Sequence, residues 1–413
     1  MKLSTMADSS FAPPAPQERP WLFSFMIAPN AVLANGVVQG GVLAFLMSQQ
    51  NIPASRAAAV VSFLSLPTML YCLWSPLTDF LVRRRTWLLW GALLGGLLMA
   101  LGMAQGDLTS RKSVWLMFAG ACLGQLVVSA CGGMMGALKT ERDKRISGSF
   151  YQGGSLAFGA LSVFVLISVS EGRHAVWIAP LAGLLIAVPA LSALAAPAQD
   201  LVATGSFGNT MAHVWAEFKA TFLNRRAIPY LLTLGLPLAS GSAMSLLPGV
   251  ARAYGVPGTQ VAWMNGLGGA LLTALGSLSA TVVPARIRAS VAYCLIAITN
   301  AIVTAILAVG PLRPGTYFLG VTLYLFTVGM AYALFTAVLL EFMGDSGKSG
   351  SARYSLINSL GNIPVIYMIA LDGWGSGRWG TRGLAGTEAV VGGGAALCML
   401  LFFLVYKPKA VSV

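Results

Sequence analysis

The sequence predicts an all-α membrane protein with twelve transmembrane helices arranged in two parallel six-helix halves. Three observations lead to this prediction. Only 9% of the 413 residues are charged, whereas soluble domains carry about 25%. Apolar stretches of about 20 residues, long enough to cross a bilayer as a helix, recur along the whole chain. Segments of the first half of the sequence also recur in the second half at a constant offset.

Short polar connections separate the expected spans, apart from one longer connection in the middle of the chain. Residues 1–20 and 407–413 are expected to be cytoplasmic tails, which leaves two halves, 21–195 and 228–406. The linker 196–227 contains an amphipathic stretch that is expected to lie on the membrane surface. The expected spans are 21–47, 57–81, 87–104, 114–138, 150–169, 176–195, 228–250, 260–283, 290–309, 317–343, 354–371 and 385–406.

The positive charges predict the orientation. If both termini are cytoplasmic, 18 of the 26 Lys and Arg residues fall on the cytoplasmic side and 8 fall outside. This bias follows the positive-inside rule, so the net charge of +13 indicates topology rather than nucleic-acid binding. We therefore expect a multi-pass protein of a bacterial inner membrane. Its expected partners are the lipid bilayer and a small-molecule substrate, and we expect a monomer.

The internal repeat has an offset of 204 residues. At this offset, NIPASRAAAVVSFL aligns with GVPGTQVAWMNGLG, which pairs Pro53 with Pro257. The same offset pairs KRISGSFYQGGSL with KSGSARYSLINSL, and Arg84 with Arg288. Three matches at one offset predict a six-span unit repeated in parallel. This arrangement resembles the major facilitator carriers, which hold their substrate near the membrane midplane between the two halves.

Two acidic positions near span ends are candidates for gating or proton coupling. The stretch LWSPLTDFLVRRRTWL resembles the major facilitator loop motif, with Asp79 at the acid and Arg83 and Arg84 at the basic pair. The resemblance implies a gate at the inner end of span two, and an inert topology anchor is the alternative. Glu341, near the inner end of span ten, is a candidate proton site or a partner for Lys348 or Arg353, and a surface acid is the alternative. Asp372, at the outer end of span eleven, is expected to be solvated.

Polar side chains within the spans predict the lining of a substrate pocket. Such side chains usually face a partner helix or a cavity, so each of them could also serve helix packing. Because no Lys or Arg falls at a span centre, the pocket is expected to be neutral. A lining of amides, hydroxyls and aromatic rings suits a large, partly aromatic, weakly charged solute. The candidates are Asn30, Asn35, Gln39, Gln125, Tyr151, Gln152, Ser240, Trp263, Asn265, Tyr324, Tyr332, Asn358 and Asn362.

The sequence argues against other classes of function. The five cysteines are scattered inside spans without the spacing of metal ligands, so no metal site and no cofactor is expected. A membrane enzyme would need a charged or histidine-containing cluster, but His174 and His213 fall on opposite sides of the membrane. A receptor would need a soluble signalling domain, and the longest segment outside the membrane has about 30 residues. A transporter, and no enzyme, is expected.

One stretch resembles a particular branch of the facilitators. LPTMLYCLWSPLTDFLVRRRTWLL is similar to the second span of the peptide–acetyl-coenzyme A branch, which includes the anhydromuropeptide permeases. ARYSLINSLGNIP is similar to a later segment of that branch. Twelve expected spans, and Tyr71 and Cys72 in place of the usual Lys-Phe, look more like its ferric siderophore importers for rhizobactin and pyochelin. The resemblance implies proton-driven import of a pyochelin-like ferric siderophore, with an anhydromuropeptide as the alternative substrate.

Overall fold

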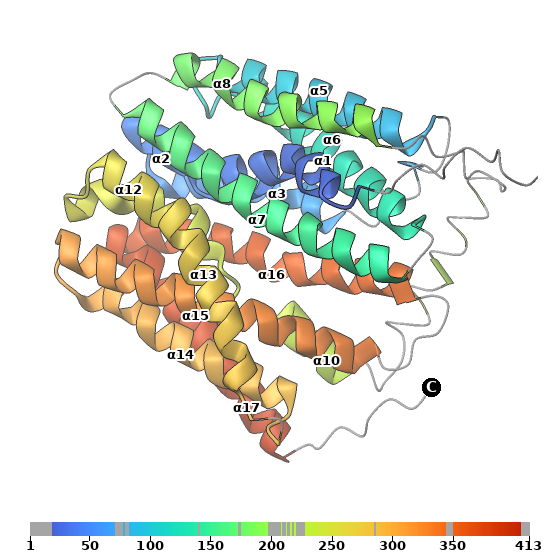
Figure 1. Ribbon diagram of the computed structural model, residues 1–413. Helices are drawn as coiled ribbons and strands as arrows, with labels where there is room; N and C mark the ends of the chain where they lie inside the picture. Colours follow the sequence, from blue (N-terminus) through green and yellow to red (C-terminus); the bar gives the residue numbers. More distant parts are fainter. Residues whose placement is uncertain are drawn as a thin grey trace, which may run out of the picture.

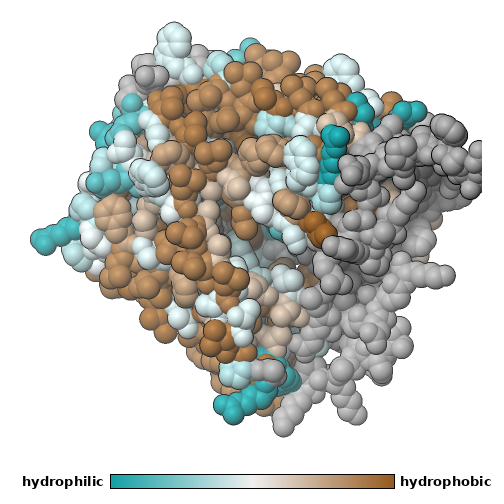
Figure 2. All heavy atoms as spheres, in the orientation of Figure 1, coloured by the Kyte–Doolittle hydropathy of each residue, from teal (hydrophilic) through white to brown (hydrophobic). Residues whose placement is uncertain are grey.

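The computed structural model describes residues 19–70, 77–78, 82–138, 141–171, 175–196, 228–284, 286–343 and 350–405, and a few positions between 208 and 219. Every secondary-structure element in this part of the chain is a helix. The all-α prediction is therefore confirmed (Figure 1). Much of the surface visible in Figure 2 is apolar, which a protein surrounded by lipid requires.

The helices of the first half begin with a bent pair and continue with long apolar segments. Their apolar residues are distributed around the whole circumference, as expected for helices that meet lipid on one side and protein on the other. The elements are α1 (Leu22–Asn30), the π-helix η1 (Ala31–Val38), α2 (Val42–Gln49), α3 (Ala54–Met69), α5 (Arg84–Met103), α6 (Arg111–Gly136), α7 (Glu141–Ser170), α8 (Ala175–Ala187) and the 3₁₀ helix η3 (Val188–Ala195).

The second half has shorter helices at its start and long ones at its end. Its elements are α10 (Ile228–Gly235), η5 (Ser242–Ser245), α11 (Leu247–Val250), η6 (Ala251–Tyr254), α12 (Gly258–Asn265), α13 (Leu267–Ser279), η7 (Ala280–Val282), α14 (Ala289–Val309), α15 (Pro314–Met343), α16 (Gly350–Trp379) and α17 (Thr381–Val405).

Most of the expected spans are long, apolar helices. In the described residues, eight helices are long and apolar enough to cross a membrane, and the pair 22–38 and 42–49, bent by 42°, forms a ninth. The three other expected spans coincide with α3, with the interrupted segment from α10 to η6, and with α16. Of these, α3 is described over 16 residues only, because 71–76 lie outside the described residues, whereas the segment from α10 to η6 is interrupted and α16 contains many polar residues.

The connections define two ends of the bundle. At the turn end, residues 50–53, 104–110, 255–257 and 310–313 join successive helices, and Gly380 alone joins α16 to α17. Gly380 has φ +67°, a conformation that glycine adopts without strain. At the opposite, terminal end, α1 begins and α17 ends (Figure 1).

The two halves lie side by side (Figure 1). In the first half, α5 packs against α6 and α8, and α1 against α7; in the second, α14 packs against α15 and α17, and α13 against α15. Contacts between the halves join α3 to α16, α2 to α11, and α7 to α12 and α13. The expected boundaries of the tails and of the linker stay predictions, because those segments lie largely outside the described residues.

The backbone shows the repeat inferred from the sequence. Asn51 and Gly255, which are 204 positions apart, both have left-handed φ values, 56° and 73°. Each is followed two residues later by a proline, Pro53 or Pro257, that precedes the next helix in an extended conformation. The equivalent turn is thus built in the same way in both halves.

Three helices are interrupted near the middle of the bundle. The first span contains the π-helix η1 and turns at Gly41, where φ is +85°. The seventh expected span loses its helix at 236–241, a stretch that we call the broken segment, where Ala239 and Gly241 have φ values of +48° and +77°. The eighth breaks at Gly266, where ψ is −110°. Non-helical backbone at membrane depth is tolerated where it borders a cavity or is buried in protein.

Candidate functional site

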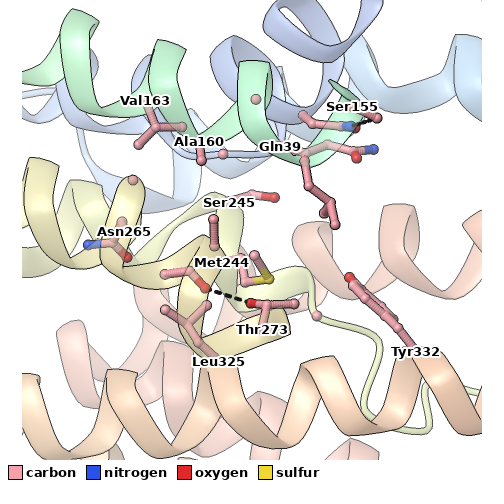
Figure 3. A pocket seen from close by; sticks show the side chains of 18 of the residues that line it. Gln39, Ser155, Ala160, Val163, Met244, Ser245, Asn265, Thr273, Leu325 and Tyr332 are labelled. Atoms are coloured by element: carbon pink, nitrogen blue, oxygen red, sulfur yellow. Dashed lines mark hydrogen bonds between the residues drawn. The ribbon is translucent and has the colours of Figure 1, made fainter. Parts of the chain in front are cut away.

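A cavity of about 230 Å³ lies between the two halves, beside these interruptions (Figure 3). The first half contributes residues of η1, the two residues that follow it, Gln39 and Gly40, and residues of α7. The second half contributes Gly241, Gly266 and residues of η5, α12, α13, α15 and α16. None of the lining residues that the structure describes carries a charge. The polar ones are Asn35, Gln39, Ser155, Ser245, Asn265, Thr273 and Tyr332.

Side chains from both halves present hydrogen-bonding groups to the cavity. Asn35 Nδ2 donates to Ser155 Oγ at 3.0 Å, which fixes the amide of η1 against α7. Across the cavity, Asn265 Nδ2 donates to the Tyr317 hydroxyl at 3.0 Å. The Tyr332 ring projects from α15 towards the cavity and is 43% exposed (Figure 3). The cavity therefore combines amide and hydroxyl groups with one aromatic ring and an aliphatic wall.

The structure brings four of the thirteen predicted pocket residues together at this cavity. They are Asn35, Gln39, Asn265 and Tyr332, two from each half. Their role in substrate binding stays a prediction.

The structure places other predicted pocket residues in helix contacts away from the cavity. Gln125 Nε2 donates to Asn30 Oδ1 at 3.4 Å, a buried contact between α6 and α1. Trp263 is 58% exposed and packs edge-to-face on Phe164. These are the helix-packing roles that the sequence left open as the alternative.

Three more predicted pocket residues are also outside the cavity lining. Tyr151 packs beside the core of the first half, and Gln152 is exposed on α7. Asn362 Nδ2 donates to the Thr68 carbonyl at 3.4 Å and so joins α16 to α3. The side chain of Asn358 lies outside the described residues.

Ser240 and Tyr324, also predicted to line the pocket, instead surround a pair of buried acids. Ser242 Oγ lies 2.8 Å from Asp372 Oδ2 and 2.5 Å from Glu388 Oε2. The Tyr324 hydroxyl donates to Glu388 Oε1 at 3.1 Å, and Ser240 Oγ approaches the same oxygen at 3.4 Å. We call Asp372 and Glu388 the carboxyl pair.

The carboxyl pair is buried at the same depth on two neighbouring helices. Asp372 is 0% exposed and Glu388 is 4% exposed. Each lies seven residues from the turn end of its helix, which at 1.5 Å per residue is about 10 Å inside the bundle. The expectation that Asp372 is solvated is therefore wrong, because α16 packs against α3 and α17 at this position and Ser242 of η5 contacts the carboxylate.

Glu388 is not among the predicted site residues, although the sequence carries a signal for it. Glu388 falls inside the expected span 385–406, and an acid within an apolar span is by default a functional residue. The absence of Lys and Arg from the span centres predicts a neutral pocket, but it does not exclude a buried acid. The packing that brings Asp372 next to Glu388 could not be deduced from the spacing of the two residues.

The predicted gate is only partly described. Arg83 is exposed and precedes α5, while Arg84 Nη1 donates to the Gly133 carbonyl of α6 at 2.6 Å. Asp79 and the side chain of Glu341 lie outside the described residues. The gating role of all four residues stays a prediction.

Solved structures of transporters resemble this architecture over almost its whole length. A D-xylose–proton symporter matches with a TM-score of 0.67 at 13% identity, covering 95% of this chain and 98% of the other. The nucleoside transporter NupG matches with a TM-score of 0.69 at 14% identity, covering 94% and 99%. A POT family transporter bound to a conjugated peptide gives 0.68 at 14% identity, covering 95% and 96%.

The chain has the major facilitator fold. At these identities the similarity concerns the fold and not the substrate. No protein-family profile matches the sequence, and neither does any curated protein sequence.

In this major facilitator fold, contacts between the halves close the turn end of the cavity. Gly249 of α11 packs on α2 so closely that a Cβ atom there would lie 2.8 Å from the Ala44 carbonyl oxygen. Beside it, the Glu171 carboxylate at the end of α7 accepts hydrogen bonds from the backbone N–H groups of Gly258 and Thr259, both at 2.9 Å. A carboxylate at a helix N-terminus is stabilised by the unpaired N–H groups and by the helix dipole.

Replacing Glu171 with alanine is expected to open the turn end more often, because this substitution removes the two charge-assisted hydrogen bonds between the halves. A loss of about 1–2 kcal/mol would change the ratio of closed to open protein by roughly 5- to 30-fold. The measurement is the alkylation rate of a cysteine introduced at Ser245, with an impermeant maleimide added at the turn-end side. Asp107→Asn, which removes an acid whose hydrogen bonds go to Thr109 and whose neighbouring Arg56 belongs to the same half, is the matched control. Equal rates for Glu171→Ala and the parent would contradict the role of Glu171.

Proposed function

We propose that the protein is a secondary transporter that carries a compact, weakly charged, partly aromatic solute through the central cavity by alternating access. The observation that carries this proposal is the uncharged cavity between the two halves, next to interrupted helices. Ligand and coupling sites at the interface between repeats, beside discontinuous helices, are characteristic of secondary transporters. The xylose, nucleoside and peptide transporters that share this fold support the same class of function.

Within that class, a pyochelin-like ferric siderophore is the first candidate substrate. Iron in such a chelate neutralises the phenolate and carboxylate groups, so that the solute presents mainly aromatic and weakly polar surface. The lining offers Gln39, Asn265 and Tyr332 for hydrogen bonds and stacking, and it offers no charge. An anhydromuropeptide is larger and carries free carboxylates, which would leave charges without basic partners in this cavity.

The volume of the cavity also favours ferric pyochelin over the larger anhydromuropeptide. About 230 Å³ lies below the usual range of ligand pockets, roughly 300–1,000 Å³, so the smaller of the two candidates is favoured. We propose that the terminal end faces the cytoplasm of a bacterium, because most positive charges are expected there. In that orientation the closed turn end is the outer side. The resemblance to the siderophore importers implies import coupled to protons, and we propose the same here.

Uptake into proteoliposomes tests this proposal. Purified protein is reconstituted, a pH gradient is imposed, and the entry of radioactive ferric pyochelin and of labelled anhydromuropeptide is compared with that of protein-free liposomes. We expect uptake of ferric pyochelin above the protein-free level. Uptake of the muropeptide alone would overturn ferric pyochelin as the substrate. If neither compound is taken up, both candidate substrates are wrong.

A further inference from the structure

We propose that Asp372, Ser242 and Glu388 form a proton-binding relay, and that its protonation sets the conformation of the broken segment at the cavity. This inference rests on the proposed transport function, because it assigns the groups that bind the driving ion. It differs from the expectation drawn from the sequence, in which Asp79 and Glu341 were the candidate proton carriers.

The first argument is the absence of a compensating cation. Among the residues that the structure describes, no Lys, Arg or His side chain lies within salt-bridge distance of Asp372 or Glu388. Two ionised carboxylates that share one hydroxyl in a buried site would repel each other without a counter-charge. Protons are the simplest positive charges that can enter such a site.

The groups facing the pair from the surrounding helices are hydroxyls. Tyr324 and Tyr332 of α15 are the titratable side chains on that side of Glu388. The helices α10 and α14 contain no charged residue. The three arginines described on the packed helices point elsewhere. Arg382 of α17 donates to the Gly310 carbonyl, Arg56 of α3 lies beside Asp107, and Arg378 is exposed in the last turn of α16.

The hydrogen bonds define where a proton sits. Glu388 has three donors, the hydroxyls of Tyr324, Ser240 and Ser242, which suit an ionised carboxylate. Ser242 has one hydroxyl hydrogen and therefore cannot donate to both acids. If that hydrogen points to Glu388, the contact between Ser242 Oγ and Asp372 Oδ2 requires a proton on Asp372.

The environment of Asp372 agrees with this assignment. Its other oxygen, Oδ1, is buried and has no hydrogen-bond partner. Ionised Asp372 would hold a negative charge with a single donor at most, whereas the protonated acid donates to Ser242. The resting site thus carries one proton on Asp372 and one negative charge on Glu388, and it can accept a second proton at Glu388.

The relay is connected to the cavity through the chain itself. Ser242 follows Gly241 and precedes Met244 and Ser245, all three of which line the cavity. A second proton on Glu388 would remove the charge that orients the hydroxyls of Ser240 and Ser242. The segment that carries them would then be free to change conformation, so that protonation and access to the cavity become linked.

Infrared spectroscopy of the full-length protein tests the site without any substrate. A protonated carboxyl group has a carbonyl stretch that an ionised one lacks. At neutral pH we expect this band in the parent and its loss in Asp372→Asn. Acidification should add a second band that is missing in Glu388→Gln. If neither variant changes the band of the parent, the relay is overturned.

Asp107→Asn is the matched control for the spectra. Asp107 lies in the exposed connection between α5 and α6, where hydrogen bonds from the backbone N–H and then the hydroxyl of Thr109 keep its pKa below the usual range. Asp107 is therefore ionised at neutral pH, and its replacement should leave the protonated-carboxyl band unchanged.

Transport by Glu388→Gln tests coupling in the same protein. We expect accumulation of ferric pyochelin driven by a pH gradient to fall at least tenfold, while exchange of labelled for unlabelled chelate without a gradient continues. Accumulation equal to that of the parent would overturn the relay as coupling site. If the parent transports no ferric pyochelin, the proposed substrate fails, and the infrared result still decides the proton site independently.

Discussion

Replacing Gly329 with leucine is expected to prevent the protein from reaching its folded state in the membrane. Gly329 lies on α15 where this helix crosses α13, and a Cβ atom there would overlap the backbone around the Thr273 carbonyl. Gly276 on the facing helix has the same relation to the Phe326 carbonyl. Ser277 Oγ also donates to the Gly329 carbonyl at 2.8 Å. Small residues that allow such close approach are typical of helix contacts in membranes.

Because backbone atoms would collide, the helices would have to separate rather than adjust a side chain. Overpacking costs about 1–3 kcal/mol where side chains can move, and more is expected here. The measurement is the yield of monodisperse protein after extraction, together with its thermal denaturation midpoint. Gly394→Leu is the matched control, since a Cβ atom at Gly394 meets nothing within 4 Å. Equal yields for the two variants would contradict the close contact of α13 and α15.

Replacing Ala160 with tryptophan is expected to abolish transport without unfolding the protein. Ala160 of α7 forms part of the cavity wall and faces the second half (Figure 3). An indole ring at this position would occupy much of the 230 Å³ that the solute needs. A loss of uptake of at least about tenfold corresponds to roughly 1.4 kcal/mol of binding free energy.

The matched control lies three residues earlier on the same helix. Ala157 is exposed and does not line the cavity, so Ala157→Trp should keep the uptake of the parent. Folding of both variants is checked by size-exclusion chromatography in detergent. Normal uptake by a well-folded Ala160→Trp variant would show that the solute does not pass through this cavity.

Hydropathy and repetition were sufficient to predict the fold, because the bilayer imposes the length and polarity of each span. The aligned turns at Asn51 and Gly255 show that even local backbone geometry follows the repeat. The spans that hydropathy describes least well are the interrupted ones, and these border the cavity. Their interruptions depend on contacts with other helices, which a single segment of sequence does not reveal.

The candidate site was less predictable than the fold. The sequence does not distinguish polar residues that line the cavity from those that pack between helices. Asn35 and Asn265 line the cavity, whereas Asn30 contacts another helix. The direction in which each side chain points depends on helix rotation, and the π-helix changes that rotation within one span. Glu388 can be recognised in the sequence as a lone acid in an apolar span. Its partner, Asp372, can be identified only from the packing of α16 against α17.

The one-residue connection at Gly380 has a consequence for the transport cycle. Along this hairpin the helices also touch through Gly375 and Gly383, so α16 and α17 are expected to move as one body. Asp372 and Glu388 would then keep their separation in every state. Ser242, which belongs to a different and interrupted span, is the partner that can depart. The two carboxyl groups would thus form a rigid proton-binding site. Whether Ser242 is bound to this site or released from it would depend on the charge of the pair, and the position of Ser242 would in turn affect the cavity.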